Sequence, residues 1–313
     1  MLRASVRRIV SIVPTLVLVV FMSFILQAAT PGDAARIIAG PLGSETEIAR
    51  IRDELDLNKP LVVQFGDYIW RIVHGNLGVS ALTGIRVTKT IFDAIPVTMS
   101  LVLVALSFAL ILALTGGVLA ALRRNTWVDR VITGTAAVGL AVPAFITGVL
   151  LVLVVAVQLR WLPATGYAYL SDGFWPWLSH LILPGLALSL VSASELTRFV
   201  RSSFVDTLDR DYIRAAEAYG LSALTVVGGR AAKNAAAPVL TVFGLQVGRL
   251  LSSAVVVEGL FSIPGFGTLA FQSAINRDIP LIQGVVLVAA GFVMLMNLLT
   301  DLLYPVLNPR LRD

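Results

Sequence analysis

The side chains of this sequence that could carry out chemistry are few and do not group into an active site. There is no cysteine, which excludes disulfides and cysteine-held metals, and the only histidines are His74 and His180. Serine and aspartate residues are scattered, without the nucleophile and neighbouring base that covalent catalysis requires. No Gly-x-x-x-x-Gly-Lys phosphate loop occurs, because none of the three lysines follows a glycine. We therefore predict no catalytic residue, no metal site and no cofactor bound to this chain.

Arg249 is the most unusual charge, because it stands between Gly248 and Leu250 inside an apolar run. A charge at membrane depth is costly and usually faces a bundle interior or a water-filled cavity. Two hypotheses follow: Arg249 attracts a substrate carboxylate in a transport pathway, or it forms a structural ion pair with a neighbouring helix. Glu195, near the end of another apolar run, is predicted to pair with Arg198 or Arg201.

Asn297 and Asp301 are two further polar residues, one helical turn apart near the end of the last apolar run. They either line the inner mouth of a pathway or hold helix ends together.

The composition places the whole chain in the membrane class. Hydrophobic residues make up 57%, charged residues 14%, and the mean hydropathy is +0.86, whereas soluble domains average about a quarter charged residues. The net charge of +5 comes from arginine-rich loops. We expect no nucleic-acid binding, because no basic patch is interleaved with aromatic residues.

Six apolar runs are long enough to cross a bilayer, which requires about 20 residues per helix. They cover residues 9–26, 97–122, 131–159, 181–196, 239–257 and 285–303. The first could be a cleaved signal peptide, but it exceeds the roughly 7–15 apolar residues of such a segment, which favours an uncleaved span. The predicted fold is an all-α, six-helix membrane protein. Its predicted segments are a first helix (1–27), an extracytoplasmic insertion (28–95) and a core (96–313).

Arginine placement predicts the orientation. The arginines gather before the first run, between the second and third, between the fourth and fifth, and after the sixth. By the positive-inside rule, both termini and these loops lie in the cytoplasm. The insertion then lies outside, with helices predicted over 45–55 and 61–73. It is either a lid over the helix ends or a docking surface for an extracytoplasmic partner.

The segment 198–238, between the fourth and fifth runs, is polar, basic and rich in alanine. Its centre reads Asp211-Tyr212-Ile213-Arg214-Ala215-Ala216-Glu217-Ala218-Tyr219-Gly220. Asp211 suits the N-terminus of a short helix, and Gly220 can adopt the positive φ that ends a helix sharply. Taken alone, this pattern favours an ordinary alanine-rich helix with positive-inside charge.

Ordered motifs along the full length make the wider pattern specific. In the C-terminal half they are Arg201-Ser202-Ser203, Asp211 to Gly220, Asn234, Pro238, Val255-Val256-Val257-Glu258, Phe261, Pro264-Gly265-Phe266-Gly267, Arg277-Asp278-Ile279-Pro280, Asp301 and Asn308-Pro309-Arg310. The N-terminal half adds Pro31-Gly32-Asp33, Leu57-Asn58-Lys59-Pro60, Gly75-Asn76-Leu77-Gly78, Asp129-Arg130 and Pro143-Ala144-Phe145. With these motifs the chain resembles the dipeptide/oligopeptide/nickel family of ATP-binding-cassette (ABC) importer permeases, specifically the first of its two membrane subunits.

This resemblance implies a type I importer in the bacterial inner membrane that moves small peptides inward. Its partners would be a second homologous permease, two ATP-binding subunits or one fused ATPase, and an extracytoplasmic binding protein. ATP and magnesium would be held by the ATPase subunits. The ATPase-coupling residues would be Arg201, Asp211, Arg214, Ala215, Ala216, Glu217 and Gly220, with small side chains allowing close approach to a partner cleft. The pathway or gate would include Arg249, Glu258, Phe261, Phe266, Asn297 and Asp301.

Arg214 departs from the glutamate of the general importer motif, and Glu217 and Tyr219 replace residues that are often basic. These departures put the charge matching to the ATPase in doubt.

Two other classes are weaker alternatives. An ion-coupled transporter would be expected to show an internal repeat, midplane carboxylates and broken helices. The apolar runs contain few carboxylates, and the basic loop would have no role. A membrane-embedded enzyme needs a clustered nucleophile or metal set, which the runs do not contain.

Overall fold

The structure is a computed structural model that describes residues 14–22, 24–25, 34–40, 43–54 and 58–307. This part of the chain is α-helical with connecting loops, and its only strand-like feature is an isolated bridge between Val79 and Arg86. The chain divides into two compact units: residues 1–96 with 268–298, and residues 97–267 with 299–313. The division at residues 27/28 and 95/96 expected from the sequence stays a prediction.

The second unit holds most of the long apolar helices. Its elements are α5 (Val87–Leu122, which starts in the first unit), α6 (Trp127–Ala141), α7 (Ala144–Leu151), η1 (Val152–Gln158), η2 (Leu170–Asp172), α8 (Phe174–Leu208), α9 (Asp211–Ala218), η3 (Thr225–Ala231) and α10 (Ala232–Phe261). In its core, Leu101 of α5, Leu188 of α8 and Phe261 of α10 belong to one buried cluster. A second cluster joins the same helices to α9 and η3.

Close packing between α5 and α8 depends on Gly117. A β-carbon there would lie 2.6 Å from Cβ of Val200 and 2.8 Å from the carbonyl oxygen of Thr197. Small residues such as this glycine let helix backbones approach closely in membranes.

Gly117→Ala is therefore expected to destabilise the chain by about 1–3 kcal/mol, because the added methyl group overpacks the contact. The midpoint of thermal unfolding in detergent measures the effect. Gly134→Ala on α6 is the matched control, since nothing lies within 4 Å of its β-carbon position. The control should be neutral or slightly stabilising, as alanine is the better helix former.

The run predicted as a single span over 131–159 is broken. The segments Trp127–Ala141 and Ala144–Gln158 meet at an angle of 105°. The break lies at Pro143, which precedes α7 with extended backbone (ψ 143°). Proline has no N–H to donate and disfavours helical backbone at the residue before it, so α6 ends and a new helix begins.

Three described helical stretches are long and apolar enough to cross a membrane: Val87–Leu122, Phe174–Leu208 and Pro238–Phe261. The bent pair of α6 and α7–η1 would make a fourth. Ile279–Leu295 in the last predicted run is apolar but shorter. The first predicted run is helical at 14–22 and 24–25, and its remaining residues lie outside the described part.

The first unit contains the insertion. Its helices are α2 (Ala34–Ala39), α3 (Glu45–Glu54), α4 (Leu61–Val73), most of α11 (Phe266–Ile275) and the first part of α12 (Ile279–Leu307). The helices expected over 45–55 and 61–73 are present as α3 and α4, although Leu55 lies outside the described residues. Asp278 precedes α12 and accepts hydrogen bonds from the Ser80 hydroxyl and the Ala81 N–H (3.2 Å). This buried carboxylate ties the end of the insertion to the start of α12.

Tyr68 on α4 packs against Val20 and Phe24. Burial raises the pKa of its phenol to about 12, partly opposed by Arg71. The side chain is therefore neutral at physiological pH.

Candidate functional site

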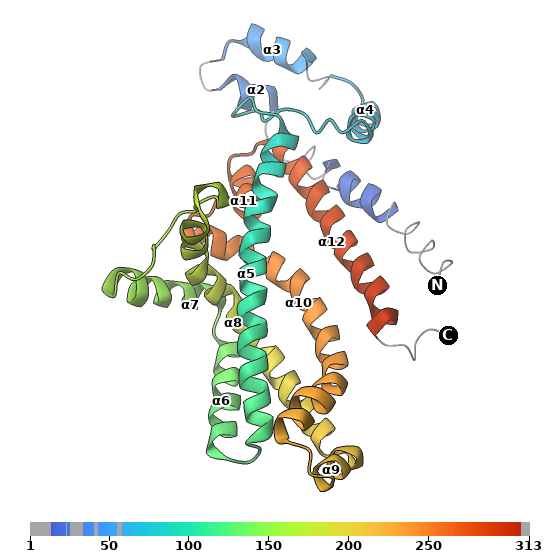
Figure 1. Ribbon diagram of the computed structural model, residues 1–313. Helices are drawn as coiled ribbons and strands as arrows, with labels where there is room; N and C mark the ends of the chain where they lie inside the picture. Colours follow the sequence, from blue (N-terminus) through green and yellow to red (C-terminus); the bar gives the residue numbers. More distant parts are fainter. Residues whose placement is uncertain (1–13, 23, 26–33, 41–42, 55–57, 308–313) are drawn as a thin grey trace. The chain divides into compact units, whose positions relative to one another are not determined.

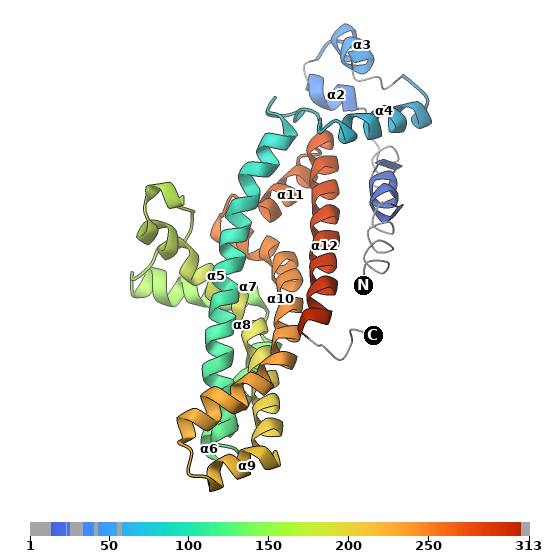
Figure 2. The ribbon, with the colours of Figure 1, turned by 45° about the vertical axis from the view of Figure 1, so that its right-hand side comes forward.

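The segment predicted to couple to an ATPase is mostly helical. α8 continues to Leu208, ten residues beyond Arg198, and α9 begins at Asp211. α9 lies between α8 and α10 at one end of the second unit (Figures 1 and 2), the same end as the start of α6. Gly220 has φ 77°, a left-handed conformation that suits glycine, and it lies just after the end of α9.

The two faces of α9 have different environments. Ile213 and Ala216 are buried and pack into the cluster that contains Phe204 and Val226. Arg214 and Ala215 are exposed. The methyl group of Ala216, 2% exposed, therefore serves packing within the chain and not the contact with a partner expected from the sequence. Ala215 is a small residue on the open face.

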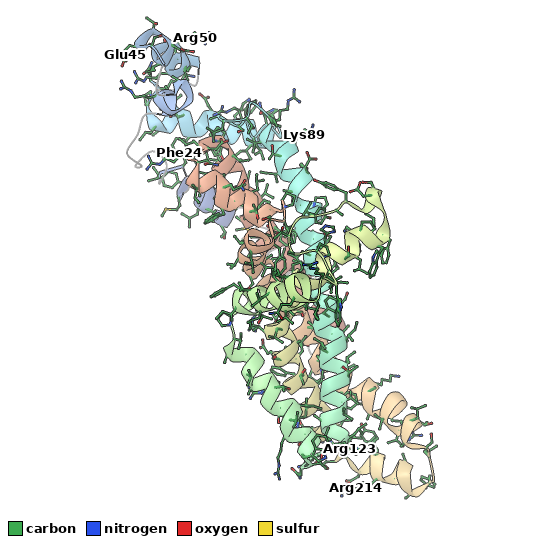
Figure 3. The ribbon with its side chains drawn as sticks, turned by 90° about the vertical axis from the view of Figure 1, so that its left-hand side faces the viewer. Phe24, Glu45, Arg50, Lys89, Arg123 and Arg214 are labelled. Atoms are coloured by element: carbon green, nitrogen blue, oxygen red, sulfur yellow. The ribbon has the colours of Figure 1, made fainter. Side chains whose placement is uncertain are left out.

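Two large apolar side chains follow α9 on this end of the unit. Tyr219 is 88% exposed and Leu224 is 87% exposed. Arg214 and Arg123, the residue that follows α5, both lie toward this end of the unit in Figure 3, so positive charge is present at this end. Among the described residues, the charged partner of the Arg214 side chain is Asp211, at a long 4.0 Å. The sequence motif did not single out Leu224, since one exposed leucine has no distinctive pattern.

Arg201 is engaged within the chain. Its Nε donates to Oδ1 of Asp129 at 2.5 Å, and its Nη2 donates to Oδ2 at 2.7 Å. The Asn125 N–H also donates to Oδ2 of Asp129 at 3.0 Å. This pair joins α8 to the first turn of α6. Within this chain Arg201 pairs with Asp129, because the fold places that carboxylate beside it; the ATPase-coupling role that the resemblance implies for Arg201 stays a prediction.

Asp129→Ala is expected to destabilise the chain by about 2–4 kcal/mol, since it leaves a mostly buried guanidinium without its carboxylate. The side chains of Arg201 and Asp129 are 28% and 6% exposed. Chemical or thermal unfolding in detergent measures the loss. Asp209→Ala is the control, because its pair with Arg124 is exposed on both sides and such pairs contribute little. Equal losses in the two variants would contradict the prediction.

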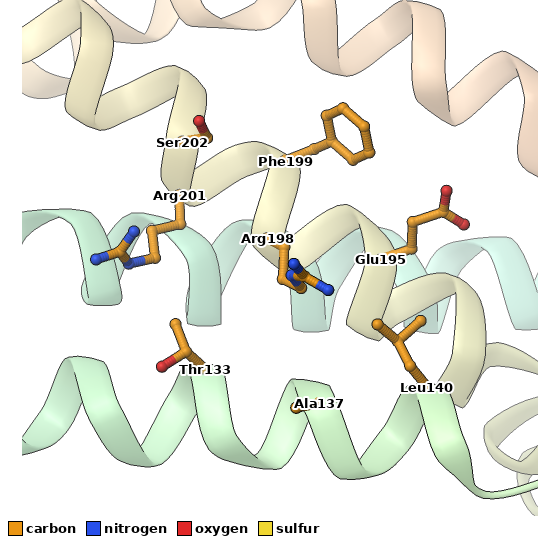
Figure 4. Close-up of a pocket in the computed structure, with 8 residues that line it drawn as sticks. All are labelled: Thr133, Ala137, Leu140, Glu195, Arg198, Phe199, Arg201 and Ser202. Atoms are coloured by element: carbon orange, nitrogen blue, oxygen red, sulfur yellow. The ribbon is translucent and has the colours of Figure 1, made fainter.

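An open pocket of about 840 Å³ lies between α6 and α8. Its lining comprises Thr133, Ala137, Leu140, Glu195, Arg198, Phe199, Arg201 and Ser202. Figure 4 shows Thr133 and Leu140 on α6 facing α8, whereas Glu195 points away from α6.

Glu195 bonds to α10, not to the arginines on its own helix. Its Oε2 accepts hydrogen bonds from Arg249 Nη1 and from Gln246 Nε2, the second at 3.1 Å. Ser192 Oγ donates to Gln246 Oε1 at 2.9 Å. The sequence-based pairing of Glu195 with Arg198 or Arg201 was therefore wrong. Residues 195 and 249 are far apart in the sequence, and only the packing of α8 against α10 joins them.

Glu258 is fully buried near the C-terminal end of α10. Thr98 Oγ1 donates to its Oε1 at 2.5 Å and accepts from the Phe266 N–H at 2.7 Å. Gly265 lies against the Glu258 carboxylate, where a β-carbon would come within 2.4 Å. Phe261 is also buried, and its carbonyl oxygen accepts from the Gly166 N–H at 2.7 Å. The structure thus gathers the predicted gate residues Glu258, Phe261 and Phe266 around one turn.

Three predicted site residues cannot be placed further. Glu217 lies in α9, and Asn297 and Asp301 lie in α12, but their side chains are outside the described part of the structure. Their roles remain predictions.

Comparison with known proteins decides the family. Residues 113–313 match the "Binding-protein-dependent transport system inner membrane component" family, and residues 1–102 match the N-terminal membrane component of the same systems. The chain belongs to this family. It is thus a membrane permease subunit of a transport system, as the resemblance implied.

Similar proteins cover nearly the whole chain. A probable peptide ABC transporter permease of Sinorhizobium fredii is 38% identical over 98% of each chain. A glutathione transport system permease of Salmonella choleraesuis is 39% identical over 100% of this chain and 99% of its own length. The inward-facing MetNI methionine ABC transporter shares the fold, with a TM-score of 0.58, 15% identity and coverage of 70% of this chain and 97% of that chain.

Proposed function

We propose that this permease is one of two membrane subunits of an ATP-driven importer that moves small peptides inward. The peptide cargo is supported by the names of the full-length relatives, which are a peptide and a glutathione permease. The working complex would contain a second homologous permease, ATPase subunits that hold ATP and magnesium, and an extracytoplasmic binding protein. The chain itself would carry out no covalent chemistry.

The observation that carries the proposal is the split character of α9. Ile213 and Ala216 anchor one face to the chain, while Arg214 and Ala215 lie on the open face. A helix fixed on one side and open on the other can transmit movement from a bound partner into α8 and α10. The Ala215 methyl group permits close backbone approach, and the nearby apolar Tyr219 and Leu224 are exposed as contacts for that partner.

The proposed orientation places this end of the molecule in the cytoplasm, with both termini on the same side of the inner membrane. The arginine distribution supports it. The insertion would then face outward, where exposed apolar residues such as Val62 and Trp70 on α4 are open to a binding protein or cover the helix ends.

Purification of the tagged chain from its native membrane tests the proposal. We expect a second permease and ATPase subunits to co-purify, and mass spectrometry identifies them. The complex, placed in liposomes with its binding protein, should accumulate labelled di- or tripeptides only with ATP inside. A chain that purifies alone and transports without ATP would overturn the proposal.

A further inference from the structure

An ion pair at the middle of α10 lies on a face that the described chain leaves open. Arg249 lies eleven positions after Pro238 and twelve positions before Phe261. At 1.5 Å per residue, Arg249 is about 16–18 Å from each end of this candidate span. Its side chain is nevertheless 59% exposed, and nothing lies within 4 Å of a β-carbon at the adjacent Gly248. Because a guanidinium at that depth avoids hydrocarbon, this face meets another protein surface or water.

A buried hydrogen-bond chain holds the Glu195 carboxylate in place. Gln246, 1% exposed, donates to Glu195 and accepts from the buried Ser192. Both bonds from α10 use Oε2 of Glu195. Within the described residues, Oε1 of Glu195 and the Nε and Nη2 groups of Arg249 make no hydrogen bond, so both partners retain unused capacity.

From this arrangement we infer that Glu195 and Arg249 form a binding station for the charged ends of a short peptide. The inference rests on the proposed function. Arg249 binds the terminal carboxylate, and Glu195 binds the terminal ammonium. A peptide with free ends carries one group of each sign, which matches the one guanidinium and one carboxylate of the station.

The pairing also explains why such charges are suited to a pathway. When a zwitterion enters, each protein charge exchanges its internal partner for a group on the peptide, so neither is left uncompensated. When the peptide leaves, the internal pair closes again. Passage requires binding that is strong enough for entry and weak enough for release, and an exchangeable pair meets both conditions.

Direct binding tests the assignment. The complex, purified with its co-purifying subunits in lipid nanodiscs and without ATP or binding protein, is titrated with labelled dialanine, its C-terminal amide and its N-acetyl form. Arg249→Gln should weaken binding of free dialanine at least 10-fold and leave the amide unchanged. Glu195→Gln should weaken free dialanine similarly and leave the N-acetyl form unchanged. Arg124→Gln, which removes an exposed pair elsewhere, should change neither.

The double variant Glu195→Gln/Arg249→Gln distinguishes a peptide-binding station from a brace, meaning an ion pair that only stabilises the packing of α8 against α10. It leaves no unpaired charge, so it should assemble even where a single variant does not. A brace predicts peptide uptake near the wild-type rate, whereas the station predicts assembly with at least a 10-fold loss of uptake. Unchanged dialanine binding in both single variants, or wild-type uptake in the double variant, would overturn the inference. Failure of the wild-type complex to accumulate peptide with ATP and binding protein would instead overturn the proposed function.

Discussion

Gly267→Ala should destabilise the permease by about 3 kcal/mol, at the upper end of the cost of overpacking. A β-carbon at Gly267 would lie 2.7 Å from Cα of Val255 and 2.9 Å from Oε2 of Glu258. The first of these atoms is backbone inside α10, and the second belongs to a fully buried carboxylate. Neither can move without disturbing the bond between Glu258 and Thr98 that closes the turn before α11. Thermal unfolding in detergent and the yield of folded chain measure the loss.

Gly259→Ala provides the matched control for this site. Gly259 also lies in α10, but nothing lies within 4 Å of its β-carbon position. Its replacement should leave stability unchanged or slightly higher, because alanine favours helix. A loss as large as that of Gly267→Ala would show that the effect comes from general sensitivity of this helix, not from the Glu258 contact.

Ala215→Trp should reduce ATP-driven uptake at least 10-fold without unfolding the chain. Ala215 is on the open face of α9, so the indole has room within this chain but blocks close approach by the proposed ATPase partner. The expected signs are loss of co-purifying ATPase and of uptake, with the unfolding midpoint of the chain near that of the wild type.

Ala216→Trp, at the next position, should also reduce uptake, but by destabilising the chain. The Ala216 side chain is buried against the cluster that contains Ile213 and Phe204, so an indole there overfills the core. We expect lower stability together with lower uptake.

If Ala215→Trp retained full uptake and its ATPase, the open face of α9 would not be the coupling surface.

Local features of the structure were predictable from the residues. The spacing of apolar residues located α3 and α4, and the polar stretch around Asp211 located α9, because local periodicity and helix-end chemistry depend on near neighbours. Gly220 was expected to have positive φ and has it. The break at Pro143 was less predictable, because proline beside a span is compatible with a start, a kink or a full break.

The partner of each charged side chain was not predictable, although an ion pair of Arg249 with a neighbouring helix was one of the two hypotheses drawn from the sequence. Glu195 pairs with Arg249 and Arg201 pairs with Asp129, although sequence reasoning assigned Glu195 to its own helix and Arg201 to a partner. Likewise the sequence did not distinguish the two small residues Ala215 and Ala216. In the structure Ala215 is exposed and Ala216 is buried.

The sequence by itself determined the membrane class, the all-α fold, the ordered motifs of the family and the position of α9. Those properties follow from composition and from residues that are near one another along the chain. Only the tertiary structure decided which charges are satisfied internally and which face of each helix is open. Side chains separated by 54 or 72 residues meet through helix packing, and no local pattern encodes that meeting.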